Sequence, residues 1–129
     1  MQKTQVNPWT WQDQLGFSQA WTVTGAEALI FLSGQAPIDP DGHLVGKDDF
    51  DAQAAQAFDN LAAVLHQAGA SFDSVVKITV YLTDIARIRD FGRIKARYIS
   101  GAQPASTAIG VTALALPGMM LEVEAIAVI

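Results

Sequence analysis

The apolar run Leu29-Ile30-Phe31-Leu32, which stops abruptly at Ser33-Gly34-Gln35, constrains the fold more than any other stretch of the chain. A run this short, rich in β-formers and closed by Gly and Pro, is typical of a buried strand that ends at an open edge. At that end Ser33 offers a hydroxyl group, and Gly34 leaves backbone that a ligand can approach closely. The same Ser-Gly pair is typical of a simple turn, so its weight as a binding site depends on the residues that follow.

The composition predicts a single domain that hides part of its surface against other subunits. Only 16% of the 129 residues are charged, against about 25% in an average soluble protein. A monomer of this size buries only about two-thirds of its unfolded surface, so the shortage of charge indicates oligomerisation. We predict one domain over residues 1–129, with residues 1–15 as an N-terminal arm.

Charge and residue usage argue against several classes of function. The formal net charge of −5 repels phosphate backbones, which argues against nucleic-acid binding and ribonuclease activity. The chain has no cysteine, and its two histidines, His43 and His66, fall on different expected elements, so we predict no metal site. No apolar run approaches the roughly 20 residues of a membrane span. With no signal peptide recognisable either, we expect a soluble cytoplasmic protein without membrane partners.

Hydrophobic periodicity predicts the element order β-β-α-β-α-β-β, an α+β fold with two helices on one face of a mostly antiparallel sheet. The last two strands are expected to form a hairpin that turns at Pro117-Gly118. The expected elements are strands at 21–24 and 29–33, a helix at about 51–68, a strand at 75–83, a helix at about 86–99, and strands at 107–114 and 119–128.

Each expected helix has one apolar face, which predicts packing against the sheet. The third strand alternates between an apolar face and a polar face that can line an interface or a cavity. The residues expected to face inward from the helices are Ala54, Phe58, Leu61, Leu65, Ala68, Ile88, Phe91, Ile94 and Tyr98, whereas Arg89, Arg93 and Arg97 form an exposed stripe. The polar face of the strand carries Lys77, Thr79, Tyr81 and Thr83.

Two glutamates on the last strand are the strongest candidates for chemistry. Glu122 and Glu124 point the same way, about 7 Å apart by strand geometry, and Ile126 and Val128 continue the same face as apolar. A carboxylate at such a rim, partly desolvated and beside a like charge, tends toward a raised pKa. It can then orient a water or pass a proton. The alternative is a pair of solvated glutamates on a strand face.

Several separated motifs together resemble the reactive intermediate deaminase family (Rid, also called YjgF-like). The likeness covers the chain from about Gly16 to its end, with the motifs in the family's order. The motifs are Ser33-Gly34-Gln35, Gln56-Ala57-Phe58-Asp59-Asn60-Leu61 with Ala68-Gly69-Ala70, Val76-Lys77-Ile78-Thr79-Val80-Tyr81-Leu82, Pro104-Ala105, and Leu121-Glu122-Val123-Glu124-Ala125-Ile126-Ala127-Val128.

The resemblance implies a chorismate-mutase-like fold assembled as a homotrimer, with a ligand cleft between each pair of neighbouring subunits. Typical members hydrolyse enamine and imine products of amino-acid metabolism to keto acids and ammonia. They do so without a metal or an organic cofactor. In these members an arginine pairs with the substrate carboxylate, and a glutamate positions the attacking water.

The family's site residues are only partly present here. The resemblance places Ser33 and Gly34 at the family's strand-end contacts and Glu122 at the water-positioning glutamate. Phe17 falls where the family often has tyrosine, Gly92 where it often has asparagine, and Ala108 where one subgroup has cysteine. Ser106 stands in the position of the carboxylate-binding arginine, which follows Pro-Ala directly in the family.

Loss of that arginine changes the expected substrate. A hydroxyl neither attracts nor orients a carboxylate as a bidentate guanidinium does, and such a contact is worth about 1.5–3 kcal/mol. We therefore expect a deaminase-like hydrolase, related to 2-iminobutanoate/2-iminopropanoate deaminases, whose substrate is not a simple 2-imino acid. The alternative is a non-catalytic trimer that binds a small ligand or stabilises a partner. Lys77, or a basic residue between Arg87 and Arg97, is a candidate replacement cation.

The early tryptophans Trp9, Trp11 and Trp21 lie close together in the sequence. Aromatic residues are favoured at clefts and subunit contacts, so an ordered arm carrying Trp9 and Trp11 can cover a cleft or a subunit seam. Packing of the arm on its own subunit is the alternative.

Overall fold

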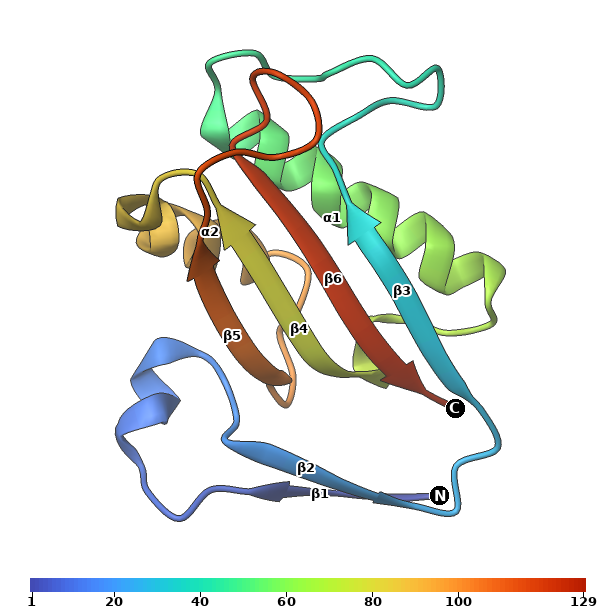
Figure 1. The fold of residues 1–129 in the computed structure, drawn as a ribbon. Helices are drawn as coiled ribbons and strands as arrows, with labels where there is room; N and C mark the ends of the chain where they lie inside the picture. The colour runs from blue at the N-terminus through green and yellow to red at the C-terminus, as the bar shows by residue number, and fades with distance from the viewer.

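The computed structural model describes residues 1–129. Two helices cover one face of a four-stranded sheet, and a two-stranded hairpin lies apart from that sheet (Figure 1). Neither helix has the length and apolar character needed to cross a membrane. The elements are β1 (Gln2–Val6), η1 (Trp11–Leu15), β2 (Ala20–Thr24), β3 (Leu29–Gln35), α1 (Phe50–Gln67), η2 (Phe72–Ser74), β4 (Val75–Leu82), η3 (Ile85–Arg87), α2 (Ile88–Lys95), β5 (Ala105–Gly110) and β6 (Leu121–Val128).

The sheet order is β3-β6-β4-β5, and β4 is the strand whose pairing differs most from the expectation. It runs parallel to β5 and antiparallel to β6, so it separates the last two strands. The expected hairpin across Pro117-Gly118 is therefore wrong. A parallel pair needs a crossover connection, and α2 supplies it between β4 and β5 (Figure 1).

Helix α1 begins and ends where its flanking residues allow. Asp49 is the N-cap, and its carboxylate accepts a hydrogen bond of 3.1 Å from the Ala52 backbone N–H. Gly69 follows the helix with φ of 75°, a left-handed conformation that glycine adopts without strain. The expected apolar stripe is buried apart from Ala68, which is exposed because it lies beyond the last helical turn.

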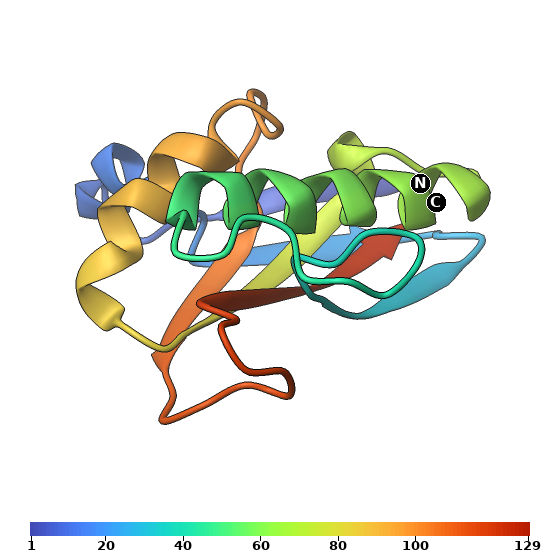
Figure 2. The ribbon, with the colours of Figure 1, turned by 90° about the horizontal axis from the view of Figure 1, so that it is seen from above.

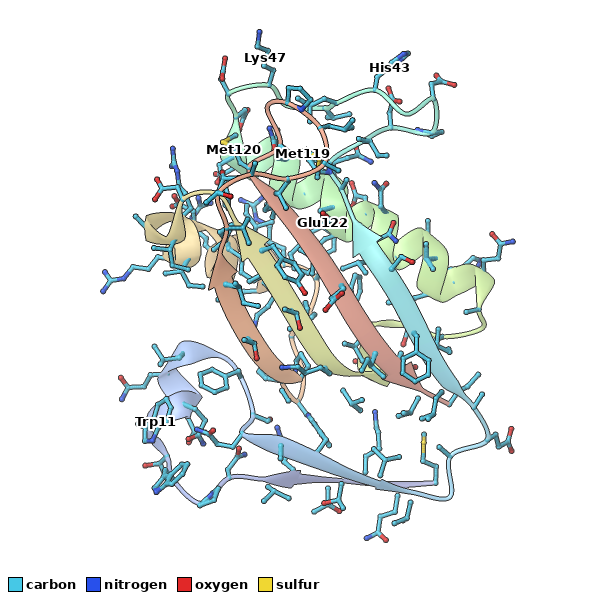
Figure 3. All side chains as sticks on the ribbon, in the orientation of Figure 1. Trp11, His43, Lys47, Met119, Met120 and Glu122 are labelled. Atoms are coloured by element: carbon cyan, nitrogen blue, oxygen red, sulfur yellow. The ribbon has the colours of Figure 1, made fainter.

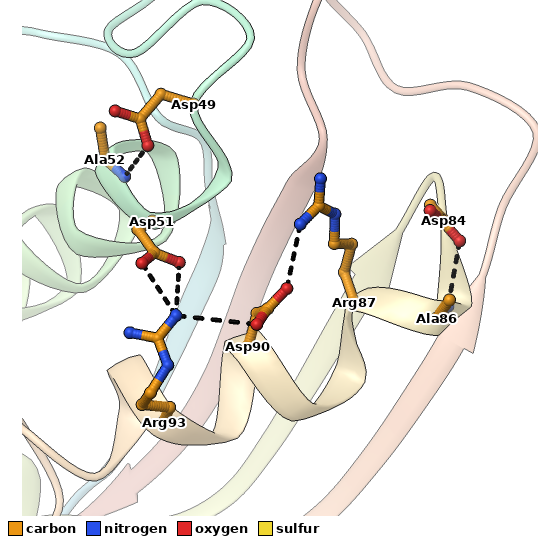
Figure 4. A network of polar contacts seen from close by, with 8 residues as sticks. All are labelled: Asp49, Asp51, Ala52, Asp84, Ala86, Arg87, Asp90 and Arg93. Atoms are coloured by element: carbon orange, nitrogen blue, oxygen red, sulfur yellow. Dashed lines mark hydrogen bonds and ion pairs between the residues drawn. The ribbon is translucent and has the colours of Figure 1, made fainter.

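Helix α2 is shorter than expected at both ends, because a separate 3-10 turn, η3, precedes it and because it ends at Lys95 instead of residue 99. Ile88, expected to face inward, is 38% exposed at the first turn of α2, whereas Phe91 and Ile94 are buried as expected. The arginine stripe is exposed. Arg93 binds Asp51 through both carboxylate oxygens, at 2.9 and 2.8 Å, and thereby links the two helices (Figure 4).

The core lies between the helix layer and the sheet, which Figure 2 shows edge-on. Phe58 of α1 is fully buried at its centre. Its ring stacks on Tyr98 and Phe91, with centroid separations of 4.9 and 5.6 Å. The opposite face of the sheet has no helix on it, and we call it the open face. Phe31, on this face, is 73% exposed.

The N-terminal arm contains a strand that the sequence did not predict. β1 pairs antiparallel with β2, and four of its five residues are exposed, so it lacks the apolar alternation of a half-buried strand. The hairpin is anchored beside β5: Ser18 forms a parallel bridge with Ala105, and the Trp21 indole N–H donates to the Gln103 carbonyl oxygen at 2.9 Å.

Candidate functional site

An open pocket of about 1030 Å³ lies between α2, β5 and the η1 segment of the arm. It collects four of the candidate residues, Phe17, Gly92, Ser106 and Ala108, from three separate parts of the chain. Ser106 and Ala108 pair with Ile78 and Val80 of β4, so both point to the helix-covered face of the sheet. These four residues therefore line the same pocket, which we call the α2 pocket.

Aromatic side chains of the arm stand beside Phe17 at this pocket. Trp11 packs edge-on against Phe17 at a centroid separation of 5.8 Å, and Trp9 stacks on Trp11 at 6.3 Å. Both tryptophans are more than half exposed. The arm thus contacts its own subunit, and it still presents two large aromatic surfaces to solvent beside the pocket.

Lys95 is one of the basic residues between Arg87 and Arg97 that the sequence offered as a replacement cation without distinguishing among them. It lines the α2 pocket, is only 6% exposed, and donates from Nζ to the Gly16 carbonyl oxygen at 2.5 Å. Burial lowers the pKa of its ammonium below the usual 10.5. A lysine within a run of helix charges is typical of a solvated face. The available signal was its position next to buried Ile94, four residues after Phe91.

Glu122 lies on the open face of the sheet together with Ser33 and Gly34, away from η1 and Trp11 (Figure 3). The pairing of β3 with β6 is irregular between Leu32 and Gln35, at Ser33 and Gly34. A Cβ atom on Gly34 would lie 2.2 Å from Glu122 Oε1. The carboxylate of Glu122 therefore occupies the space that a side chain at position 34 would fill. Ser33 is exposed beside it.

The two glutamates of β6 have different surroundings. The Tyr81 hydroxyl donates to Glu124 Oε1 at 2.9 Å, and this hydrogen bond raises the pKa of Tyr81. Glu122 has no side-chain hydrogen bond or ion pair within the chain, although it is partly buried. Glu122 is therefore the carboxylate left free to accept from a water or a ligand.

Within one chain, the candidate site residues fall into two groups that do not line a common pocket. Phe17, Gly92, Ser106 and Ala108 line the α2 pocket on the helix-covered side, whereas Glu122, Ser33 and Gly34 are outside it. Lys77, a candidate replacement cation, is also outside the pocket, where its ammonium donates to Thr107 Oγ1 at 2.7 Å.

The loop before α1 brings Asp39, Asp41 and His43 close enough for their ligand atoms to lie within 4.8 Å of one another. Local hydrogen bonds account for this cluster. Asp39 Oδ1 accepts from the backbone N–H groups of Asp41 and His43, and the bond from His43 is the main reason that the pKa of Asp39 is lowered. The arrangement is that of a capped turn.

Comparison with known proteins places this architecture in a family. The profile described as "Endoribonuclease L-PSP" matches residues 12–129. The chain is 39% identical over 112 residues to Protein DfrA of Myxococcus xanthus, covering 87% of this chain and 84% of that one. It is 38% identical over 112 residues to the 2-iminobutanoate/2-iminopropanoate deaminase of Mus musculus, covering 87% and 80%.

Among solved structures, the Rid-family protein YyfB of Yersinia pestis, described as of unknown function, superposes with a TM-score of 0.88 at 36% identity. The match covers 100% of both chains, so it includes the N-terminal arm. Two helices on a mostly antiparallel mixed sheet are the chorismate-mutase-like architecture. The chain belongs to the reactive intermediate deaminase (Rid, YjgF-like) family, as the sequence motifs indicated.

Proposed function

We propose that this protein is a deaminase-like hydrolase for a small imine or enamine that is not a simple 2-imino acid. In the reaction, water adds to the imine carbon and ammonia leaves, so that one imine and one water give one carbonyl compound and one ammonia. The relative from Mus musculus named a 2-iminobutanoate/2-iminopropanoate deaminase supports the reaction class. Ser106 in the position of the family's arginine supports the altered substrate.

The observation that carries the proposal is the free carboxylate of Glu122 above Gly34. A carboxylate oxygen without a partner accepts a hydrogen bond from water, orients it and takes up a proton as the new C–O bond forms. Gly34 keeps the space in which that carboxylate lies. In the proposed mechanism Ser33 holds the reacting end of the ligand, while Phe17, Gly92, Ser106 and Ala108 form the wall around its body.

The test is the pair of substitutions Glu122→Gln and Glu124→Gln, assayed with imines generated in situ against the uncatalysed rate. The two residues share one strand and one face, but only Glu124 is bound by Tyr81. Glu122→Gln is expected to abolish turnover with assembly intact, and Glu124→Gln to retain it. Equal turnover by Glu122→Gln and the wild type would refute the catalytic role.

The residues of the α2 pocket and the Glu122 carboxylate lie on opposite sides of the sheet. This separation favours a homotrimer in which each cleft joins the α2 pocket of one subunit to Glu122 of the next. Mixing inactive Glu122→Gln subunits with pocket-blocked Ser106→Trp subunits tests this arrangement. Random assembly in equal amounts is expected to restore about a quarter of the sites, because an intact cleft then needs one subunit of each kind in a fixed order. No recovery on mixing, or a monomer in light scattering, would contradict a shared cleft.

A non-catalytic trimer that binds a small ligand in the same cleft is the second candidate, and Ser106 in the arginine position is the observation that favours it. Failure of the wild type to accelerate hydrolysis of any imine, with ligand binding retained, would select this function. The endoribonuclease in the family's description does not fit this chain as well. Its net charge is −5, and the α2 pocket holds no histidine.

A further inference from the structure

The α2 pocket contains a buried cation that no acidic side chain neutralises. Lys95 stands at the last turn of α2, is 6% exposed, and has one hydrogen-bond partner, the Gly16 carbonyl oxygen. None of the ion pairs of the chain includes it. An ammonium group has three N–H donors, so two of them are left without a protein partner.

The other charged residues that line the pocket do not neutralise the positive charge of Lys95. Asp13 of η1 and Arg89 of α2 are both exposed, so water screens them. Asp13 Oδ1 accepts from the side-chain amide of Gln12 at 3.2 Å. Lys95 is therefore the one charged group of the pocket that is withdrawn from solvent.

Withdrawing an ammonium from water is costly unless an opposite charge compensates. Within the chain only the partial charge of the Gly16 carbonyl oxygen does so, and burial accordingly lowers the pKa of Lys95. An anion that enters the pocket would restore the missing partner. A buried, charge-assisted hydrogen bond of this kind forms strongly because little water competes for it.

We infer that Lys95 binds the anionic group of the ligand, and that the ligand is a carboxylate-bearing imine, or its carbonyl product, too large to be a simple 2-imino acid. The inference rests on the proposed function for the imine, whereas the anionic group follows from Lys95 alone. The pocket, which is open to solvent and has a volume of about 1030 Å³, leaves room for a ligand larger than a simple 2-imino acid.

Placing the cation on α2 changes what the pocket selects. The arginine of the family follows Pro-Ala, which here lies at the start of β5, and that position is now Ser106. Lys95 reaches the pocket from the helix and contacts Gly16 instead. An ammonium is a compact point charge without the planar fork of arginine, so it selects for negative charge and imposes little orientation on the carboxylate.

The test compares an anionic and a neutral probe with the same phenylbutanoate skeleton, 2-oxo-4-phenylbutanoate and its ethyl ester, by titration calorimetry on the assembled wild-type protein. The acid is expected to bind at least about tenfold more tightly than the ester, as a buried charge-assisted contact implies. Lys95→Met keeps the length of the side chain and removes the charge, and should abolish this preference. Arg97→Met, an exposed cation two residues later and outside the pocket, should leave the preference unchanged.

Affinity for the acid should also fall as the pH rises through the lowered pKa of Lys95, whereas affinity for the ester should not. Equal binding of acid and ester by the wild type, or a preference that survives in Lys95→Met, would overturn the inference. Loss of the preference in Arg89→Met with retention in Lys95→Met would overturn it as well. Lys95-dependent acid binding without imine hydrolysis would instead refute the proposed reaction and leave the anion site standing.

Discussion

Gly34→Ala tests whether the position of the Glu122 carboxylate matters for function. The added Cβ would lie 2.2 Å from Glu122 Oε1 and 2.8 Å from Cδ, whereas ordinary contacts begin at 3.4 Å. The carboxylate oxygen must therefore move by about 0.8 Å to reach the shortest tolerated contact of 3.0 Å, and by about 1.2 Å to reach an ordinary one of 3.4 Å. A misplacement of about 1 Å in a reacting group costs about a hundredfold in rate. We expect kcat for imine hydrolysis to fall by that order.

The fold should tolerate the same substitution. The atoms in conflict belong to the end of a flexible side chain, and Gly34 does not have the positive φ that would strain an alanine. Moving one side chain off its preferred rotamer costs about 1 kcal/mol, and replacing glycine by alanine returns a similar amount through the unfolded chain. The free energy of unfolding, measured by denaturant titration, should therefore change by less than about 1 kcal/mol.

Two controls make the result decisive. Gly110→Ala adds the same atom to a strand glycine whose nearest neighbour, Ile85 Cβ, would lie at an ordinary 3.5 Å, so kcat should be unchanged. In the Glu124→Gln background, which is expected to retain turnover, Gly34→Ala should cause the same fold loss as in the wild type, since the added Cβ displaces the carboxylate of Glu122. An unaltered kcat for Gly34→Ala, or a loss that disappears in the Glu124→Gln background, would refute the reasoning.

Three further predictions concern stability and titration. Phe58→Ala empties the fully buried centre of the aromatic core and should lower the free energy of unfolding by about 3–5 kcal/mol in denaturant titration; a loss below about 1 kcal/mol would contradict this packing. In Tyr81→Phe, absorbance at the tyrosinate band should show one transition with a pKa of about 12, because burial and the hydrogen bond to Asp59 hold the Tyr98 proton; a transition at the ordinary value of 10.0 would exclude that environment. Lys95→Met should unfold at higher denaturant concentration than the wild type at neutral pH, because burial lowers the pKa of Lys95 in the folded state. The difference in unfolding midpoint should shrink as the pH rises toward 10.5. A difference that does not depend on pH would show that it does not come from the charge of Lys95.

The sequence predicted the elements whose burial follows a simple period. The stripe of α1 through Phe58 was confirmed, because side chains at helical spacing share a face. On β4 the apolar residues Ile78, Val80 and Leu82 are buried as predicted, but Thr79 of the predicted polar face is buried as well. β1 was missed because a mostly exposed strand has no apolar alternation to detect. The final hairpin was wrong because neighbours in sequence are only a default for pairing, and here α2 allows β5 to pair parallel with β4.

Some residues of the candidate site could be predicted from the sequence, whereas the burial of others is visible only in the folded structure. The motifs identified the correct family, and four of the positions that the resemblance assigned to the site, Phe17, Gly92, Ser106 and Ala108, line one pocket. Lys95 carried no comparable signal, because a lysine among arginines is typical of a solvated helix face. Its ammonium instead donates to the carbonyl oxygen of Gly16, which directly follows η1 and lies 79 positions earlier in the sequence.

The strand register explains why the site residues separate into two groups. Directly paired residues of neighbouring strands share a face of the sheet. Ser106 pairs with Ile78, on the helix-covered face, and Glu122 pairs with Tyr81, on the open face. Ile78 and Tyr81 are an odd number of positions apart on β4, so their partners point in opposite directions. A reaction that uses both the α2 pocket and Glu122 therefore requires a second copy of the chain, which is why the mixed-subunit experiment tests the mechanism as directly as any substitution of Glu122 itself.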